Sequence, residues 1–238
     1  MSEWMAKRFW KASEVAPVAD GFTVLLDGRA VKTPAKAALV LPTRAMAQAV
    51  AQEWDAQPEV IAPLSMPVTR AANAAIDKVR VQHAEVAAMI AGYGESDLLC
   101  HRAESPVELA ARQAAAWDPL LDWACTALGA PLVPTVGVMP RAQPPASLSA
   151  LSARVGALDP FELTALHDLV GLSGSLVIGL AAMEDFLPAP QLWDISRIDE
   201  TWQEEQWGTD DEAAEAAAVK RRDFLRARDF LDLVRASG

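Results

Sequence analysis

Cysteine and histidine are scarce in this chain of 238 residues, which has two cysteines, Cys100 and Cys125, and three histidines. Their spacing matches no metal-binding pattern, because a structural zinc site needs several such ligands grouped at short intervals. We therefore expect no metal site. We interpret both cysteines as small buried residues of a protein from a reducing compartment.

Basic residues and long apolar runs are also in short supply. The chain has 21 Lys and Arg against 32 Asp and Glu, for a formal net charge of -11, which argues against nucleic-acid binding because phosphate neutralisation needs a basic patch. The longest apolar run, Ser175 to Met183, is about half of the ~20 residues that a membrane span requires. It predicts a buried helix and no membrane insertion. The first ten residues lack the apolar core of a signal peptide, so we expect a bacterial cytoplasmic location.

The familiar catalytic motifs are missing as well. The stretch Gly171–Ser175 ends in Ser where a nucleophile elbow requires Gly. Gly92–Glu95 lacks the third glycine of a dinucleotide loop, and Gly174 to Gly179 is not followed by the Lys-Ser or Lys-Thr of a phosphate loop. We therefore expect no catalytic residues and no cofactor, and the chain is not predicted to be an enzyme.

What the sequence does contain is an acidic segment rich in tryptophan, residues 202–212, in a stretch without Lys or Arg between Arg197 and Lys220. Tryptophan offers much contact area with few rotatable bonds, and carboxylates beside it select a partner by charge. This acidic tryptophan segment therefore predicts a partner-binding surface. The candidate residues are Trp202, Glu204, Glu205, Gln206, Trp207, Asp210, Asp211 and Glu212.

A second interpretation of the same segment stays open, in which the tryptophans belong to the core and the acids form the solvated face of a helix. The last helix is predicted to begin at Thr209, with Glu212 three residues later and basic residues toward its other end. That order of charges matches the helix dipole, so the acids at 210–212 have a structural explanation too.

The N-terminal part predicts a small sheet covered by a helix. Phe22–Leu26 and Arg29–Lys32 flank Asp27-Gly28, and two extended runs around Asp-Gly indicate a hairpin with a type I′ turn. Arg8–Lys11 and Ala38–Leu41 could add strands. Apolar residues then recur every four positions in a predicted helix over residues 43–57, at Met46, Val50 and Trp54.

Three prolines, Pro58, Pro63 and Pro67, follow that helix and mark the predicted domain junction. We expect an α+β fold, with a small N-terminal sheet-plus-helix domain over residues 1–66. A larger all-helical C-terminal domain, an orthogonal bundle, is expected over residues 67–238.

Helix boundaries in the C-terminal part are predicted from caps and breakers. Ser105–Glu108 and Asp159–Glu162 both have the form of a capping box with Pro at the first helical position. Gly129 and Gly171 are predicted helix ends, and Pro119 is expected to break or bend the helix between Ser105 and Gly129. One long helix is expected over residues 69–93, because apolar residues recur there in steps of three and four. A proline-rich link is expected over residues 131–145.

Several blocks occur together and in order along the chain. This set closely resembles the ATP synthase assembly chaperone family that binds the alpha subunit of the catalytic head, the F-one sector, and it covers nearly the whole chain. It departs from the family pattern at Trp10 and His101, where tyrosine is common. The blocks are Arg8–Lys11, Leu26–Pro34, Glu53–Gln57, Met66–Thr69, Asp97–Arg102, Trp117–Leu120 and Glu205–Gly208.

The resemblance implies an N-terminal α+β domain, a helical C-terminal domain and no catalytic activity. The implied function is that of an assembly chaperone, which binds the free alpha subunit and shields its interface from aggregation until the beta subunit replaces it. We expect the free protein to be a monomer in the bacterial cytoplasm; eukaryotic relatives would act in the mitochondrial matrix. Two alternatives remain open, an enzyme with an unfamiliar site between the domains and a permanent subunit of the synthase.

Overall fold

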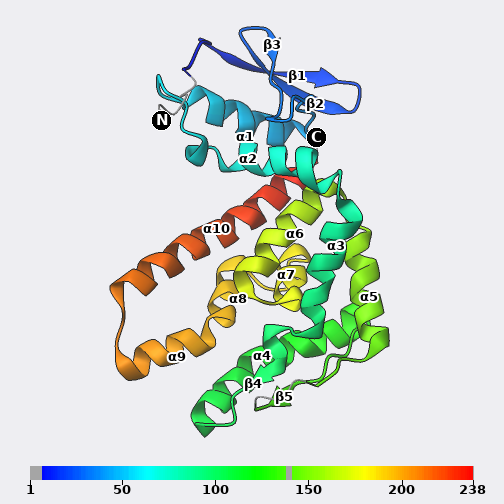
Figure 1. Cartoon of the computed structure of the whole chain (residues 1–238), viewed down its shortest axis with the longest axis vertical. Helices are drawn as coiled ribbons and strands as arrows, with labels where there is room; N and C mark the ends of the chain where they lie inside the picture. The colour runs from blue at the N-terminus through cyan, green and yellow to red at the C-terminus, as the bar shows by residue number, and fades with distance from the viewer. Residues whose placement is uncertain (1–6, 138–140, 238) are drawn as a thin grey trace. The chain divides into compact units, whose positions relative to one another are not determined.

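The computed structural model describes residues 7–137 and 141–237. Strands lie near the N-terminus and helices make up most of the rest (Figure 1), so the predicted α+β class is confirmed. The start of the predicted N-terminal domain and residues 138–140 of the predicted link lie outside the described residues.

The N-terminal sheet is a three-stranded antiparallel meander of β1 (Ser13–Val18), β2 (Gly21–Leu26) and β3 (Arg29–Ala30). The predicted hairpin is confirmed, since the turn between β2 and β3 has positive φ at both central residues, 47° at Asp27 and 80° at Gly28. The Asp27 carboxylate also accepts hydrogen bonds from the backbone of Lys11 and Ala12. These bonds hold its pKa below the ordinary value and tie the turn to the chain entering β1.

The sheet differs from the prediction on both sides of the hairpin. Arg8–Lys11 forms no strand: the Arg8 guanidinium donates to the carbonyls of Asp55 and Gln57 at 2.8 and 2.7 Å, which holds this stretch against residues 55–57. The second partner of β2, besides β3, is instead β1, which was not predicted from the sequence. On the other side, Ala38–Leu41 contributes only single bridges to the hairpin.

Helix α1 (Arg44–Asp55) confirms the helix predicted over residues 43–57. Its N-cap is Thr43, whose side chain accepts a hydrogen bond from the backbone N–H of Met46 at 3.1 Å. Met46 and Val50 of the predicted apolar stripe are fully buried and Trp54 is half-buried, so the stripe faces the core as expected. Beyond α1, a short 3-10 turn (η1, Pro63–Ser65) precedes α2 (Pro67–Ala74), which has Pro67 at its first position.

The single helix predicted over residues 69–93 is wrong, because several helical pieces with different hydrogen-bond spacings occupy this stretch. Helix α2 passes into a π-helical turn (η2, Ala75–Val79), and α3 (His83–Ala91) begins only after a turn. The backbone N–H of Arg80 bonds to the carbonyl of Ala75, and this wider spacing shifts the helical register. Three residues of the predicted apolar face are nevertheless buried, namely Ile76, Val79 and Ile90.

Helix α4 (Val107–Leu128) differs from its prediction at two places. The capping box at Ser105 is not formed, because Pro106 itself occupies the N-cap position and no side chain caps the helix. Pro119 lies inside the helix without ending it. The predicted end at Gly129 is confirmed, since Gly129 adopts a left-handed conformation with φ of 63°.

The second predicted capping box is present at the start of α6 (Pro160–Ser173). Asp159 accepts from the backbone N–H of Phe161 and Glu162, and Glu162 accepts in return from the N–H of Asp159. The predicted stop at Gly171 is wrong. The helix continues to Ser173, and Gly174, with φ of 75°, follows its end.

The core of the helical part is α7 (Leu176–Met183), in which every residue is buried. This confirms the buried helix predicted from the apolar run. Gly179 lies so close to α6 that an added Cβ would meet Val170 Cγ2 at 2.5 Å. Around α7 the chain adds further short and long helices and a two-residue parallel strand pair. These elements are η3 (Gly92–Glu95), η4 (Leu98–Cys100), β4 (His101–Arg102), β5 (Thr135–Val136), α5 (Pro145–Gly156), α8 (Ala189–Ser196), α9 (Ile198–Trp207) and α10 (Asp211–Arg235).

The described residues group into two compact units. The first comprises residues 7–83 with 159–164 and 229–237, and the second comprises residues 84–137, 141–158 and 165–228. The second unit is helical apart from the β4–β5 pair. The predicted junction between residues 66 and 67 stays a prediction.

Candidate functional site

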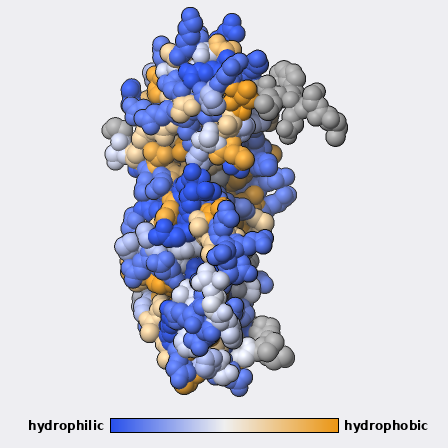
Figure 2. All heavy atoms as spheres, turned by 90° about the vertical axis from the view of Figure 1, so that its left-hand side faces the viewer, coloured by the Kyte–Doolittle hydropathy of each residue, from blue (hydrophilic) through white to orange (hydrophobic). Residues whose placement is uncertain are grey.

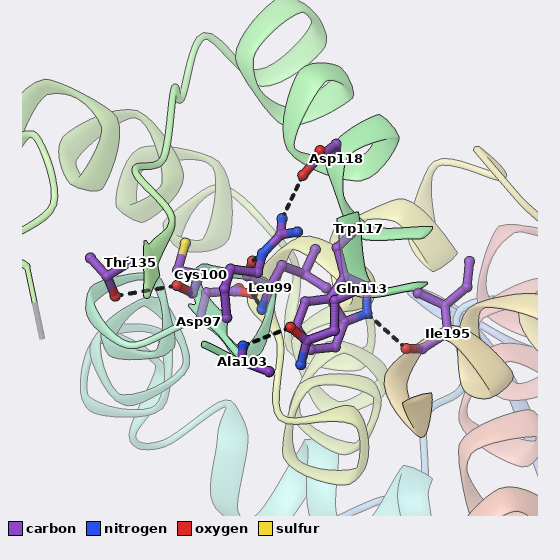
Figure 3. Close-up of polar contacts among 10 residues, drawn as sticks. Asp97, Leu99, Cys100, Ala103, Gln113, Trp117, Asp118, Thr135 and Ile195 are labelled. Atoms are coloured by element: carbon purple, nitrogen blue, oxygen red, sulfur yellow. Dashed lines mark hydrogen bonds and ion pairs between the residues drawn. The ribbon is translucent and has the colours of Figure 1, made fainter. Parts of the chain in front are cut away.

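Helix α9, which carries the start of the acidic tryptophan segment, is held in place by α4. The amide of Gln113, which is almost completely buried, donates to Asp199 Oδ1 in the first turn of α9 at 2.6 Å. Four residues further along α4, Trp117 Nε1 donates to the carbonyl of Ile195 in α8 at 3.0 Å (Figure 3). One face of α4 therefore fixes both α8 and the beginning of α9.

The same face of α4 also binds the segment that precedes it. Gln113 Oε1 accepts from the backbone N–H of Ala103 at 2.8 Å. Arg102 donates to the Leu99 carbonyl at 2.9 Å and to Asp118 at 2.7 Å, with its guanidinium 5.2 Å from the centre of the Trp117 ring (Figure 3). The guanidinium is shielded from water and paired, so these residues form an internal polar network that holds helices together.

Asp97 is the most deeply buried acid of the described chain and belongs to this region. Its carboxylate accepts from the backbone N–H of Leu99 and Val177 and from the Ser175 hydroxyl, at 3.0, 3.1 and 2.7 Å. Burial outweighs these bonds and raises the pKa of Asp97 above its ordinary value. Because each bond goes to the chain itself, Asp97 links η4 to the start of α7 and has a structural role.

The predicted partner-binding residues lie in α9 from its middle onward, in the turn after it and in the first turn of α10. Seven of the eight are exposed, and Trp202 is half-buried. Trp207 ends α9 with 79% of its surface exposed, unlike the buried Trp10, Trp117 and Trp193. The exposed residues are Glu204, Glu205, Gln206, Trp207, Asp210, Asp211 and Glu212.

Helix α9 ends at Gly208. This residue has φ of 91°, a region that favours glycine, and its N–H bonds to the carbonyl of Glu204. Helix α10 begins at Asp211 instead of Thr209, because Asp210 is the residue that caps it: Asp210 Oδ1 accepts from the N–H of Ala213 at 3.0 Å. The turn keeps Trp207 and the acids of both helix ends close together along the chain.

Two of the predicted acids have partners within the chain. Glu205 bonds to the guanidinium of Arg112 on α4 at 2.7 Å, and this bond lowers the pKa of Glu205 and raises that of Arg112. Asp210 has the capping role described above. Arg112 was not predicted from the sequence, because it lies 93 positions away from Glu205 and no local sequence pattern marks it.

A pocket of about 350 Å³ lies beside this segment. It is lined by the buried residues Trp193 and Ile198 and by Ala217 of α10. The charged residues around it are Arg112, Asp194, Arg197, Glu200 and Glu204. Of the predicted site residues, only Glu204 lines the pocket.

Other titratable groups offer little for catalysis or metal binding. His167 and Asp168 form an exposed pair at 2.9 Å, which raises the pKa of the histidine. Burial raises the pKa of the Cys100 thiol to about 12, whereas Cys125 is exposed, contrary to the prediction that both cysteines are buried. Within residues 7–137 and 141–237, no cluster of three or more His, Cys, Asp or Glu is arranged to hold a metal ion.

The visible surface mixes hydrophilic and hydrophobic residues (Figure 2). Figure 2 shows one face of the molecule, on which hydrophilic residues predominate and hydrophobic ones form small separate patches. In the described ranges, none of the helices combines the length and the hydropathy needed to cross a bilayer.

Comparisons with known proteins agree with one another. Residues 7–125 match the family described as ATP12 chaperone protein. The crystal structure of Atp12 from Paracoccus denitrificans is similar to this chain with 50% sequence identity and a TM-score of 0.95, over 98% of this chain and 100% of that one. The Atu1473 protein from Agrobacterium tumefaciens is similar with 43% identity and a TM-score of 0.92, over 97% and 87% of the two chains. The sequence blocks, the fold and these likenesses together show that the chain belongs to the ATP12 family of ATP synthase assembly chaperones.

Proposed function

We propose that this chain binds the free alpha subunit of the ATP synthase catalytic head and covers its subunit interface until the beta subunit replaces it. The observation that carries the proposal is family membership, supported by a 50% identical Atp12 structure along nearly the whole chain. The choice of the alpha subunit rests on the resemblance of the sequence blocks. We further propose that the free protein is a monomer in a bacterial cytoplasm and catalyses no reaction.

Elementary thermodynamics explains how such a chaperone works without nucleotide hydrolysis. Subunits of an obligate assembly expose interfaces that commonly bury about 2,000 Å² or more of largely apolar surface, and such patches self-associate when bare. A protein that binds the exposed patch lowers the concentration of the free form by mass action. A final interface larger than that with the chaperone can then drive its release.

The proposed contact surface is the acidic tryptophan segment. Trp207 presents a large aromatic surface to solvent at a helix end, where its removal from water on binding would be favourable. The carboxylates around it would select a basic surface on the partner. The proposed contact residues are Trp202, Glu204, Glu205, Gln206, Trp207, Asp210, Asp211 and Glu212.

The experiment is size-exclusion chromatography of the purified protein with isolated alpha subunit at micromolar concentration. We expect the two to elute together, the beta subunit to displace this chain, and the finished synthase to lack it. Failure to co-elute would contradict the proposal, and ATP hydrolysis that survives repurification would contradict the absence of catalysis.

A matched pair of variants tests the contact surface. Trp207→Ala removes the exposed aromatic, whereas Leu64→Ala changes an equally exposed residue, 78% against 79%, in the first unit. We expect only Trp207→Ala to weaken binding of the alpha subunit. Equal affinities for the two variants would show that Trp207 is not part of the contact.

A further inference from the structure

We infer that the pocket beside α9 receives one basic side chain, lysine or arginine, of the alpha subunit. This inference rests on the proposed function and adds to it the chemical group that is recognised. It is argued from the shape of the pocket and from the balance of charge around it.

The size and the walls of the pocket suit one long side chain. Its volume of about 350 Å³ is at the small end of the range for ligand sites, which is roughly 300–1,000 Å³. Trp193 and Ile198 present apolar surface, with 4% and 6% of their surface exposed, and Ala217 adds a small apolar side chain. The aliphatic stem of lysine or arginine packs well on such walls while its charged end stays at the polar rim.

Both arginines of the pocket are already paired with acids of the chain. Arg197 binds Glu200 at 2.8 Å and lies over the ring of Trp193, 5.6 Å from its centre. Arg112 binds Glu205 at 2.7 Å. An acidic group from a partner would therefore have to compete with an existing carboxylate at either arginine.

Two acids at the pocket, Asp194 and Glu204, have exposed side chains. Neither forms a side-chain ion pair or hydrogen bond with another residue in the described ranges. With both arginines neutralised, these carboxylates leave the rim with an excess of negative charge. A basic side chain would complement this excess, and charge-assisted hydrogen bonds to a carboxylate are among the stronger polar contacts in proteins.

The pocket also adjoins the proposed contact surface. Glu204 lines the pocket, and its carbonyl accepts the hydrogen bond from Gly208 that ends α9 next to Trp207. A partner that covers Trp207 would therefore bring its own side chains close to the pocket mouth.

The test compares the double variant Asp194→Asn/Glu204→Gln with Glu215→Gln, which removes an exposed acid of α10 outside the pocket. Affinity for the alpha subunit is measured at several salt concentrations. We expect the Kd to rise about tenfold for the double variant, the effect of losing one charge-assisted hydrogen bond. Its salt dependence should become shallower, and Glu215→Gln should behave as the wild type.

A second variant, Ala217→Leu, fills the pocket without changing charge and should also weaken binding. A carbodiimide that joins carboxylates to amines identifies the bound group: a cross-link between Glu204 or Asp194 and a lysine of the alpha subunit supports lysine. Loss of affinity in the variants without any cross-link supports arginine.

The outcomes separate this inference from the proposed function. If the wild type binds the alpha subunit and the double variant binds equally well, the inference is overturned and the proposed function stands. If the wild type does not bind, the proposed function itself fails. The melting temperature of each variant shows whether it is folded.

Discussion

Asp97 offers the sharpest test of how the helical unit is held together. Its buried carboxylate accepts from the backbone N–H groups of Leu99 and Val177 and from the Ser175 hydroxyl. Asp97→Ala removes every acceptor at once. Ser175 can turn to another partner, but the two backbone donors are fixed in η4 and α7.

The magnitude follows from the two donors that are left without a partner. A buried unsatisfied donor costs about 1–3 kcal/mol, so Asp97→Ala should lower the free energy of unfolding by about 2–6 kcal/mol. This is a large part of the ~5–15 kcal/mol that stabilises a typical domain. Asp97→Asn keeps the shape and one oxygen, so it should cost less.

The pH dependence has a definite sign. Burial raises the folded-state pKa of Asp97 above its ordinary value of 3.8. At pH values between the pKa of Asp97 in the unfolded chain and its higher pKa in the folded protein, the folded protein binds more protons than the unfolded chain. The contribution of Asp97 to stability therefore falls as the pH rises through the folded pKa. The Asn variant lacks this titration. The advantage of the wild type over Asp97→Asn should therefore shrink as pH rises above 3.8.

Urea unfolding followed by circular dichroism measures both effects, with the three proteins compared at each pH. An Asp97→Ala variant within about 1 kcal/mol of the wild type would refute the reasoning, because at least one orphaned buried donor must cost that much. A wild-type advantage that grows with pH would show that the carboxylate is stabilised, not destabilised, as an ion.

Three further predictions follow from contacts described above. Glu205→Lys should weaken binding of the alpha subunit and should also break the ion pair with Arg112. Adding Arg112→Glu restores this ion pair with the charges reversed, so it should restore any loss of melting temperature but not the affinity. Recovery of both quantities would show that Glu205 has only an internal role. Gly179→Ala should destabilise by about 1–3 kcal/mol in urea unfolding, because the new methyl meets Val170 at 2.5 Å, and an unchanged midpoint would contradict it. Thr43→Val should cost about 1 kcal/mol through loss of the α1 cap, measured in the same way, whereas a stabilised protein would count against the cap.

Features that depend on neighbouring residues were predictable from the sequence. The Asp27-Gly28 turn, the Thr43 helix start and the Asp159 capping box all arise from local backbone requirements. The buried α7 follows from composition, since eight successive residues with hardly a polar group leave no solvated face.

Other features were missed because distant contacts override local signals. Pro17 argues against a strand, yet β1 is the edge of its sheet, where proline is tolerated. Pro119 lies within a helix that is well packed on both sides of it. Gly171 adopts a helical conformation, and the left-handed residue that a helix end favours is Gly174.

In the candidate site, too, local features were predictable from the sequence and contacts between distant residues were not. The exposed end of α9 at Gly208 was predictable, because glycine there favours a helix stop. The partner of Glu205 was not predictable, since Arg112 is one of many arginines in the sequence and only the fold brings α4 beside α9. The pocket could not be predicted from the sequence either, because its lining residues come from four helices.

The complete burial of α7 has a consequence for the nascent chain. Residues 176–183 emerge from the ribosome after most of the helical unit has been made, at about 5–20 residues per second. Until then, α4 lacks the apolar surface of α7 on which it packs, and Asp97 lacks the backbone donor of Val177, about 80 positions downstream. The helical unit therefore cannot complete its core until residues 176–183 have been synthesised.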